Sequence, residues 1–322
     1  MTTKKILVSG VKPTGRPHIG NYFGAMKQFV DLQEAQECRI FVANLHALTT
    51  VQDKNELEKN SYDVVLDYLG IGIDPSKTTL YLQSDVPHVS ELAWIFECIS
   101  TMPYLMRAHA FKDSEAKNKE INVGVFNYPL LMAADILVHD ANSVPVGNDQ
   151  KQHIEITRDT AEKFNRIFGD TFLLPEALIF KDLGVVPGID GQKMSKSYNN
   201  TISLFASDEE IKKCVMSIVT DSSQGIPTNV YNIHLPIHNA LGKQEVLMKI
   251  YEEKKGSYKE LKELLIEDLI TFISPMRERR KKYEDNPSEV KRIVTEGGMK
   301  MRKIVHAKMK EVREKVGLIH HE

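Results

Sequence analysis

Short apolar runs alternate with longer amphipathic stretches over the first 150 residues of the chain. The runs are rich in residues that favour strands, and they are Lys5–Val8, Arg39–Ala43 and Thr79–Leu82. Between them, apolar residues recur at helical spacing in Asn21–Gln36 and Lys54–Leu69. This alternation predicts an α/β fold with a doubly wound parallel sheet, whose ligands bind at the carboxyl ends of the strands.

The pattern changes after about Asn200. From Asp208 to Gly317 it is almost wholly helical, with charged amphipathic repeats in Tyr258–Ile270 and Val290–Val316. We therefore expect a sheet-containing domain over residues 1–200 and a smaller, all-helical domain over residues 201–322. The last helix of the smaller domain is expected to pack back on the sheet.

The composition is that of a globular protein, because 42% of the 322 residues are hydrophobic and 27% are charged. Disordered and fibrous proteins are thereby excluded. The formal net charge is −2, so the chain as a whole is not a strongly basic protein of the kind that coats nucleic acids. The segment Met276–Gly317 nevertheless carries 14 lysines and arginines against 7 acidic residues. This basic end suits contact with a polyanion, although a solvated helix face is the simpler explanation of the charge alone.

Cysteine usage and the chain start favour a cytoplasmic protein without a membrane partner. Cys38, Cys98 and Cys214 are far apart and form no C-x-x-C pair, so no zinc ribbon, redox motif or disulfide frame is expected. No apolar stretch approaches 18 residues. The first residues lack the apolar core and cleavage site of a signal peptide.

A glycine- and proline-rich loop follows the first predicted strand and ends in the histidine motif, His18-Ile19-Gly20-Asn21. Free N–H groups at a helix N-terminus bind anions, and glycine lets a phosphate approach the backbone. His18 and Asn21 would then face that anion. The alternative is a tight turn with an incidental histidine. The segment matches neither a P-loop nor G-x-G-x-x-G.

A second candidate is the lysine loop, Lys193-Met194-Ser195-Lys196-Ser197, which follows the glycine-rich segment Gly188–Gln192. Two lysines and small hydroxyls on a mobile loop can surround a triphosphate and follow its charge during reaction. A solvated basic loop is the alternative, but the pentapeptide is far more specific than a chance Lys-x-x-Lys.

An apolar helix predicted over Tyr128–Leu137 is interrupted by one carboxylate, Asp135. A buried carboxylate must be paired or hydrogen-bonded. It either caps a neighbouring helix or accepts a hydrogen bond from a substrate N–H or O–H in an apolar pocket. Such a pocket rejects an analogue without the donor, for example phenylalanine. The acceptor alone does not separate tryptophan from tyrosine.

The histidine motif and the lysine loop resemble, in order and spacing, the two signature motifs of class I aminoacyl-tRNA synthetases. The segment Val144–Glu155, its continuation Ile156–Asp159 and the upstream Met132–Asp135 are similar to tryptophanyl-tRNA synthetases of the bacterial type, and not to the tyrosyl enzymes. The resemblance covers nearly the whole chain. Beyond Asn200 it consists mainly of length and helical character.

This resemblance implies a Rossmann-type catalytic domain over residues 1–200 and a helical tRNA (anticodon)-binding domain over residues 201–322. It implies a homodimeric ligase that activates L-tryptophan with ATP to tryptophanyl-adenylate and pyrophosphate, and then acylates tRNA(Trp). The expected cofactors are ATP and Mg²⁺, with Mg²⁺ carried by ATP and no metal ligand on the chain. Two alternatives are a tyrosyl-tRNA synthetase and a non-catalytic, nucleic-acid-binding paralogue.

The resemblance also implies roles for individual residues. Those implied to be catalytic are His18, Asn21, Lys193, Ser195 and Lys196. Those implied to bind ATP are Lys12, Pro13, Thr14, Gly20, Asn21, Gly147, Asn148, Asp149, Val185, Lys193, Met194, Ser195, Lys196 and Ser197, with Gly147 and Asp149 on the ribose and Lys112 as a further phosphate contact. Those implied to bind tryptophan are Asp135 on the indole N–H, Met132 and Val146 on the ring, Tyr128 and Gln150 on the ammonium, and His46 beside the substrate.

The sequence departs from the family pattern at Lys12, where glutamine is usual. A lysine there adds positive charge near the substrate carboxylate and the phosphates. The four-thiolate iron–sulfur cluster of some relatives is not expected, because the chain has three cysteines.

Overall fold

The structure is a computed structural model, and it describes residues 4–107, 121–147, 150–179, 186–220, 225–243 and 247–318. The strands are β1 (Ile6–Val11), β2 (Glu37–Val42), β3 (Thr78–Leu82), β4 (Ser143–Pro145) and β5 (Glu176–Leu178). The α-helices are α1 (Ile19–Asn21), α2 (Lys27–Leu32), α3 (Asn44–Ala47), α4 (Lys54–Ile71), α5 (His88–Ile99), α6 (Met102–Leu105), α8 (Val123–Leu137), α9 (Lys151–Phe168), α10 (Asp208–Met216), α11 (Thr228–Ala240), α12 (Leu247–Glu253), α13 (Tyr258–Glu284) and α14 (Pro287–Val316). A π-helix, η1 (Tyr22–Met26), and two 3₁₀ turns, η2 (Gln83–Asp85) and η4 (Lys196–Tyr198), complete the elements.

The five strands form one sheet in the order β3-β2-β1-β4-β5, and all neighbouring strands are parallel. The chain leaves the central strand β1 toward β2 and β3, and then returns to the other side of β1 for β4. Doubly wound folds bind ligands at the carboxyl ends of the strands on either side of such a reversal, which here are β1 and β4. The predicted fold class is confirmed. The two short strands β4 and β5 were not predicted.

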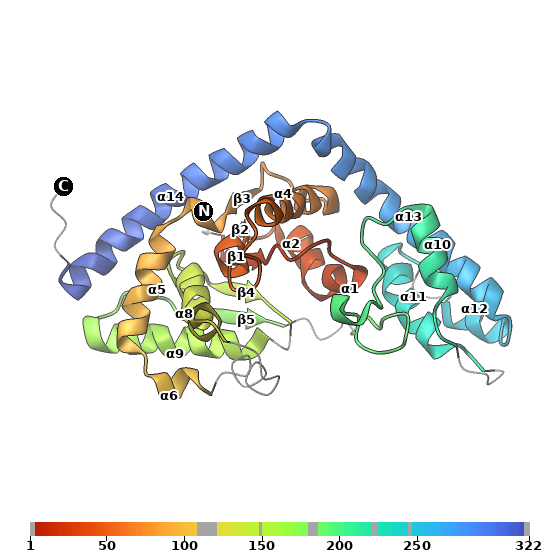
Figure 1. Cartoon of the computed structure of the whole chain (residues 1–322), viewed down its shortest axis with the longest axis horizontal. Coiled ribbons are helices and arrows are strands. Elements are labelled where there is room, and N and C mark those ends of the chain that lie inside the picture. The colour runs from red at the N-terminus through yellow and green to blue at the C-terminus, as the bar shows by residue number, and fades with distance from the viewer. Residues whose placement is uncertain are drawn as a thin grey trace.

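Helices cover both faces of the sheet (Figure 1). Successive side chains of a strand point to opposite faces. Leu7 and Ile40 accordingly belong to one buried cluster, which includes residues of α4 and α13. Val8 and Phe41 belong to the other, which includes residues of α5, α8 and α9. Within the described ranges, no helix combines the length and the apolar character needed to span a bilayer.

Local signals set the ends of α4. Asp53 precedes the helix and its carboxylate accepts a hydrogen bond from the backbone N–H of Glu56 at 2.8 Å, which caps the N-terminus. Gly72 ends the helix with a φ of +108°, a conformation that favours glycine. The predicted helix thus begins at Lys54 as expected and runs two residues beyond Leu69.

The helix α13 lies against α4 through a buried arginine. Arg280 donates from Nε to Asp67 Oδ1 at 2.7 Å, and from a terminal nitrogen to Asp63 Oδ1 at 2.8 Å. Burial raises the pKa of Asp67 to about 6, although Arg280 opposes this shift. Two helices that are far apart in the sequence are therefore joined by a buried ion pair.

The helix α14 crosses beside the edge strand β3 (Figure 1). A Cβ atom on Gly297 would lie 1.9 Å from the carbonyl oxygen of Leu80, so the crossing requires glycine. Lys300 Nζ donates to Thr79 Oγ1 at 2.9 Å. Farther along α14, Arg313 donates two hydrogen bonds to the carboxylate of Glu91 on α5. The last helix therefore contacts both the sheet and a helix that covers it.

Candidate active site

The histidine motif begins the helical segment that follows β1. His18 Nδ1 accepts a hydrogen bond from the backbone N–H of Asn21 at 3.2 Å, and Asn21 Oδ1 accepts from the backbone N–H of His18 at 3.1 Å. Burial lowers the pKa of His18 to about 4, and the charge of Lys196 acts in the same direction. The ring is therefore neutral at pH 7. Because Nδ1 is an acceptor here, we assign the ring proton to Nε2, which can donate to an anion.

The segment after the lysine loop pairs with the segment that holds the histidine motif. The backbone N–H of Ile19 donates to the carbonyl of Ile202 at 3.0 Å, and that of Leu204 donates to the carbonyl of Pro17 at 3.0 Å. These two bonds fix the end of the lysine loop beside the N-terminus of α1.

Lys196 completes the contact between the two motifs. Its Nζ donates to the carbonyl oxygen of Gly15 at 2.8 Å, across 181 positions of sequence, and to that of Thr14 at 3.1 Å. A Cβ atom on Gly20 would lie 3.4 Å from the Cβ of Met194. Burial lowers the pKa of Lys196. The two predicted phosphate-binding motifs thus meet at the carboxyl end of β1.

The remaining lysine-loop residues are held by Asn200, a residue that the sequence did not single out. Asn200 is 1% exposed. Its Oδ1 accepts from the backbone N–H of Ser195 at 2.8 Å, and its Nδ2 donates to Asp190 Oδ1 at 2.8 Å and to the carbonyl of Lys193 at 3.2 Å. Lys193 and Ser197 themselves are exposed. One buried amide therefore sets the shape of a loop whose lysine side chains face solvent.

A second polar cluster surrounds Asp135 on α8. His46 Nε2 lies 2.9 Å from Asp135 Oδ2, and Gln83 Nε2 donates to both carboxylate oxygens at 3.0 and 2.8 Å. Burial raises the pKa of Asp135, and the hydrogen bonds from His46 and Gln83 oppose the shift. The sequence analysis did not identify Gln83 as a candidate site residue. Its position could have identified it, because Gln83 is a polar residue directly after the buried strand β3, at the same edge of the sheet as the two motifs.

Tyr128 lies on the same face of α8 as Asp135, which follows it by seven positions. Its hydroxyl is 2.9 Å from His153 Nε2, and its ring centroid is 6.2 Å from that of His46. Met132, one turn before Asp135, is half-buried. The structure therefore brings together Asp135, His46 and Tyr128, and adds His153, to which no role was assigned in the sequence.

Two more predicted residues lie at the carboxyl end of β4. Val146 is buried directly after this strand, and its N–H donates to the carbonyl of Leu178 at 3.2 Å. Gln150 precedes α9, and its N–H donates to the carbonyl of Gly147 at 3.0 Å. The predicted residues Lys112, Asn148, Asp149 and Val185 lie outside the described residues.

Lys12 connects the two clusters. Its Nζ donates to Thr49 Oγ1 at 2.7 Å, and the Thr49 hydroxyl donates to the carbonyl of His46 at 2.8 Å. Burial lowers the pKa of Lys12. Pro13, the next residue, is buried and Thr14 is exposed. A cation thus lies between the anion-binding motifs and the polar cluster around Asp135.

The geometry suits one chemical task. A neutral imidazole donor, a helix N-terminus and the lysines of the lysine loop can attract a polyanion. A buried carboxylate beside apolar side chains selects a neighbouring molecule with an N–H or O–H group. The site is therefore built to hold a phosphate compound against a largely apolar second substrate.

Comparison with known proteins agrees with this arrangement. A family profile described as tRNA synthetases class I (W and Y) matches residues 2–276. A tryptophan–tRNA ligase of Fusobacterium nucleatum is 46% identical over 318 residues, which are 97% of this chain and 98% of that protein. The crystal structure of the Campylobacter jejuni tryptophanyl-tRNA synthetase, complexed with ADP and tryptophan, is similar with a TM-score of 0.88 at 44% identity, and the match covers 98% of this chain and 100% of that one. A tyrosyl-tRNA synthetase of Archaeoglobus fulgidus has the same fold, with a TM-score of 0.68 at 21% identity over 87% of this chain and 90% of that one. The chain therefore belongs to the tryptophanyl-tRNA synthetases of class I.

Proposed function

We propose that this chain is a tryptophan–tRNA ligase of the cytoplasm. It activates L-tryptophan with ATP, releases pyrophosphate, and transfers the tryptophanyl group to tRNA(Trp). The observation that carries the proposal is the contact between the lysine loop and the loop after β1, made by Lys196 with Gly15. The Campylobacter jejuni relative complexed with ADP and tryptophan supports the same pair of ligands here.

In the first step, the tryptophan carboxylate attacks the α-phosphorus of ATP and pyrophosphate leaves. The carboxylate is already ionised at neutral pH, so the step needs no general base. Negative charge grows on the phosphate oxygens, where His18 Nε2–H, Lys193 and Lys196 stabilise it. Mg²⁺ arrives bound to the phosphates of ATP and neutralises part of their charge. The chain's contribution is therefore positioning and electrostatic stabilisation.

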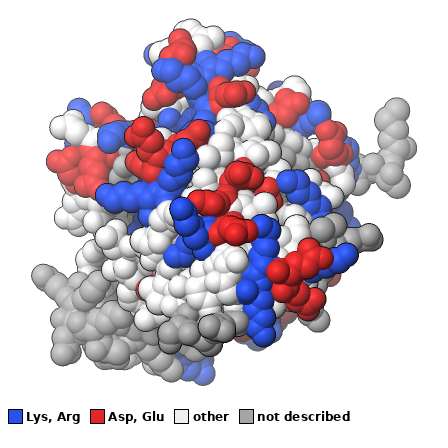
Figure 2. Space-filling model, turned by 90° about the vertical axis from the view of Figure 1, so that its right-hand side faces the viewer, with Lys and Arg blue, Asp and Glu red and all other residues white. Residues whose placement is uncertain are grey.

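In the second step, the terminal ribose hydroxyl of the tRNA attacks the adenylate carbonyl and AMP leaves. We assign tRNA binding to the helical region over residues 201–322. On the side of the molecule at the right of Figure 1, basic and acidic side chains are interspersed (Figure 2). Several lysines of residues 201–322 pair with an acid one helical turn away, as Lys281 does with Asp285 at 2.7 Å. Recognition on this side would use shape and individual hydrogen bonds more than net charge.

The tryptophan pocket is assigned to the cluster around Asp135. His46 and Gln83 hold its carboxylate in place, and a carboxylate has capacity for a further hydrogen bond from an indole N–H. Met132 and Val146 would pack on the ring. The ammonium group of the substrate would bind Tyr128 and Gln150.

The proposal is tested by exchange of labelled pyrophosphate into ATP, with each of the twenty amino acids and Mg²⁺. We expect exchange with tryptophan alone. Exchange with tyrosine would keep the class of enzyme and overturn the substrate. No exchange, with or without added tRNA, would favour the non-catalytic paralogue.

Replacing Asp135 with asparagine should lower kcat/KM for tryptophan by about 100-fold, because the site loses its acceptor and the new amide faces the donors of His46 and Gln83. The residual activity with phenylalanine should change little. The measurement is pyrophosphate exchange with both amino acids. Asp140→Asn, in the turn after the same helix, is the control. Unchanged preference for tryptophan over phenylalanine in Asp135→Asn would contradict the assigned pocket.

Replacing Asn200 with alanine should lower kcat for exchange by about tenfold or more, since the lysine loop loses the amide that holds Lys193 and Ser195 in place. The Kd for tryptophan, measured by equilibrium dialysis, should stay the same. The matched control is Asn199→Gly, because the exposed Asn199 has a φ of +51° that glycine tolerates. Equal kcat in both variants would rule out a positioning role for Asn200.

We also propose a homodimer, as the family resemblance implies. Large apolar side chains are exposed near one another on α5, α6 and α8, with Trp94 66%, Met102 65% and Val123 72% exposed. A cavity of about 370 Å³ beside them includes Leu48, Ala93 and Val123 in its lining. The helices α5 and α6 both contact α8. Exposed apolar side chains on neighbouring helices are typical of an interface, and we assign a second copy of the chain to this one.

The dimer is tested with Trp94→Glu, which should sediment as a monomer while the unmodified protein sediments as a dimer. Because Trp94 is the single tryptophan of the chain, its fluorescence provides a second readout. Dilution of the unmodified protein should shift the emission to longer wavelength. An unmodified protein that sediments as a monomer would overturn the proposal.

A further inference from the structure

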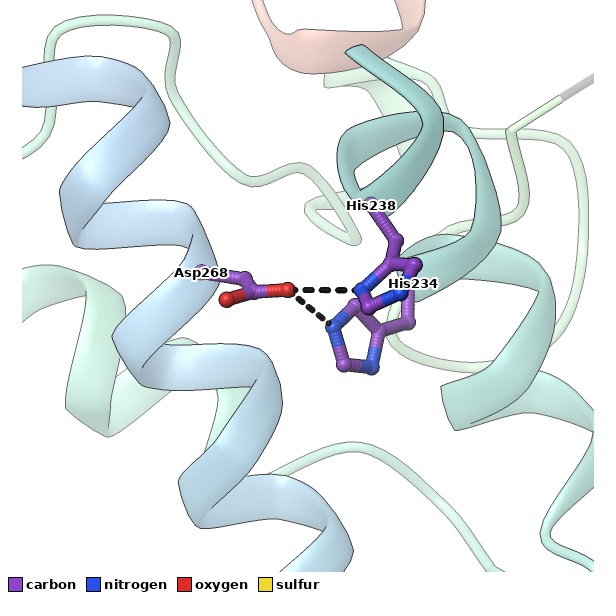
Figure 3. Close-up of side chains that lie close together, drawn as sticks. All are labelled: His234, His238 and Asp268. Atoms are coloured by element: carbon purple, nitrogen blue, oxygen red, sulfur yellow. Dashed lines mark hydrogen bonds and ion pairs between the residues drawn. The ribbon is translucent and has the colours of Figure 1, made fainter. Parts of the chain in front are cut away.

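Two histidines and an aspartate form a buried cluster between α11 and α13, in the helical region and apart from the proposed active-site residues (Figure 3). His234 Nε2 lies 3.0 Å from Asp268 Oδ2, and His238 Nδ1 lies 2.9 Å from the same oxygen. All three side chains are buried. Two imidazole nitrogens therefore converge on one carboxylate oxygen.

The helices bring these donors together. His234 and His238 are four positions apart on α11, so they lie on one face of the helix. Asp268 extends toward them from α13, as Figure 3 shows. The three candidate ligand atoms all lie within 4.8 Å of one another. A histidine pair at this spacing, completed by a carboxylate from a second helix, is a donor set that suits Zn²⁺.

Outer partners orient two of the three donors. The Tyr251 hydroxyl lies 3.0 Å from His234 Nδ1, the ring nitrogen that does not face Asp268. Lys243 Nζ donates to Asp268 Oδ1 at 3.0 Å and leaves Oδ2 to the histidines. Metal-binding histidines and carboxylates are held by partners of this kind. His238 Nε2 is buried and makes no hydrogen bond within the described part of the chain.

We propose that His234 Nε2, His238 Nδ1 and Asp268 Oδ2 bind Zn²⁺. The bound ion would link α11 to α13. Zinc–ligand distances of about 2.0–2.2 Å place tetrahedral ligand atoms about 3.3 Å apart. The present nitrogen–oxygen distances of 2.9 and 3.0 Å need to open by only about 0.4 Å. A water molecule takes the fourth position.

Binding requires each ring to offer a lone pair, so its proton moves to the other nitrogen. In His234 the proton moves to Nδ1, which then donates a hydrogen bond to the Tyr251 oxygen. In His238 it moves to Nε2. The positive charge of Lys243 weakens the site, and its side chain is half exposed and free to turn toward water when the cation binds.

The test is zinc binding by the full-length chain after chelator treatment, measured by competition with a chromophoric chelator and, with Co²⁺ in place of zinc, by visible absorption. All proteins carry His320→Ala and His321→Ala, since adjacent histidines at a chain end bind divalent ions by themselves. We expect one Zn²⁺ per chain, the absorption of tetrahedral Co²⁺, and a higher Tm with zinc than without it.

His238→Gln and Asp268→Asn keep the approximate size and the polarity of the side chains but replace a strong zinc ligand by a weakly binding amide. Both should lower zinc affinity by about 100-fold or more. Lys243→Met should raise it, because a repulsive charge is lost. His306→Gln, on the exposed face of α14, is the matched control and should bind as the parent does.

Two results would overturn the proposal. One is a parent protein that takes up no zinc at 100-fold excess of metal over protein. The other is a parent-like affinity in both His238→Gln and Asp268→Asn. Circular dichroism and the Tm without metal establish that the variants are folded, so a loss of zinc binding is separated from a loss of structure.

Discussion

Lys196→Ala should lower kcat for tryptophan-dependent pyrophosphate exchange by about 100- to 1,000-fold, while the Kd for tryptophan changes by less than about twofold. Lys196 is an exposed residue at the meeting point of the two motifs, and its Nζ is bonded to the carbonyls of Thr14 and Gly15. From there it can follow the charge that develops on the phosphates when the lysine loop closes. Tryptophan contacts none of these groups in the assigned pocket, so its binding is spared.

Lys212→Ala is the control for this variant, because Lys212 is an exposed lysine on the nearby α10. It should exchange pyrophosphate at the parent rate. Lys196→Arg should recover part of the loss, since it restores the charge with a different shape. If Lys196→Ala turns over like Lys212→Ala, the lysine loop does not stabilise the transition state.

Gly297→Ala should lower the free energy of unfolding by about 2–3 kcal/mol. Overpacking costs about 1–3 kcal/mol and occasionally more. The cost falls at the upper end here because the new methyl group meets the carbonyl oxygen of Leu80 at 1.9 Å, and a backbone atom cannot rotate away. Alanine returns less than about 1 kcal/mol through its better helix propensity. Denaturant titration followed by circular dichroism measures the change.

The matched control is Gly24→Ala. Gly24 is also helical, but a Cβ atom there would meet nothing within 4 Å. This variant should be as stable as the parent or slightly more stable. A Gly297→Ala variant with the stability of Gly24→Ala would mean that α14 does not approach β3 as closely as the structure has it.

Residues within short, specific motifs were predictable from the sequence, because the motif itself indicates the ligand. The histidine motif and the lysine loop each suit an anion, and a parallel sheet places strand ends at one edge, so their meeting there follows from local signals. The structure does bring His18 and Lys196 to the same loop after β1. Their exact roles stay predictions until the variants are measured.

Residues whose role depends on distant partners were not predictable. Gln83 is an ordinary polar residue until the fold brings it to Asp135, 52 positions away. Asn200 gains its role from the turn that returns to Asp190 and Lys193. The strands β4 and β5 have three residues each, too few for a period to be recognised. The sequence also did not single out Gly297, and the reason for a glycine there lies in the backbone of β3.

The position of α14 also affects how the protein is made. Lys300 binds Thr79, which was synthesised 221 positions earlier. At typical rates of translation, the outer edge of β3 is therefore uncovered for about 10–40 s after it leaves the ribosome. An open strand edge invites pairing with other chains. A nascent chain of this protein has to keep that edge apart from its neighbours until its final 30-residue helix is complete.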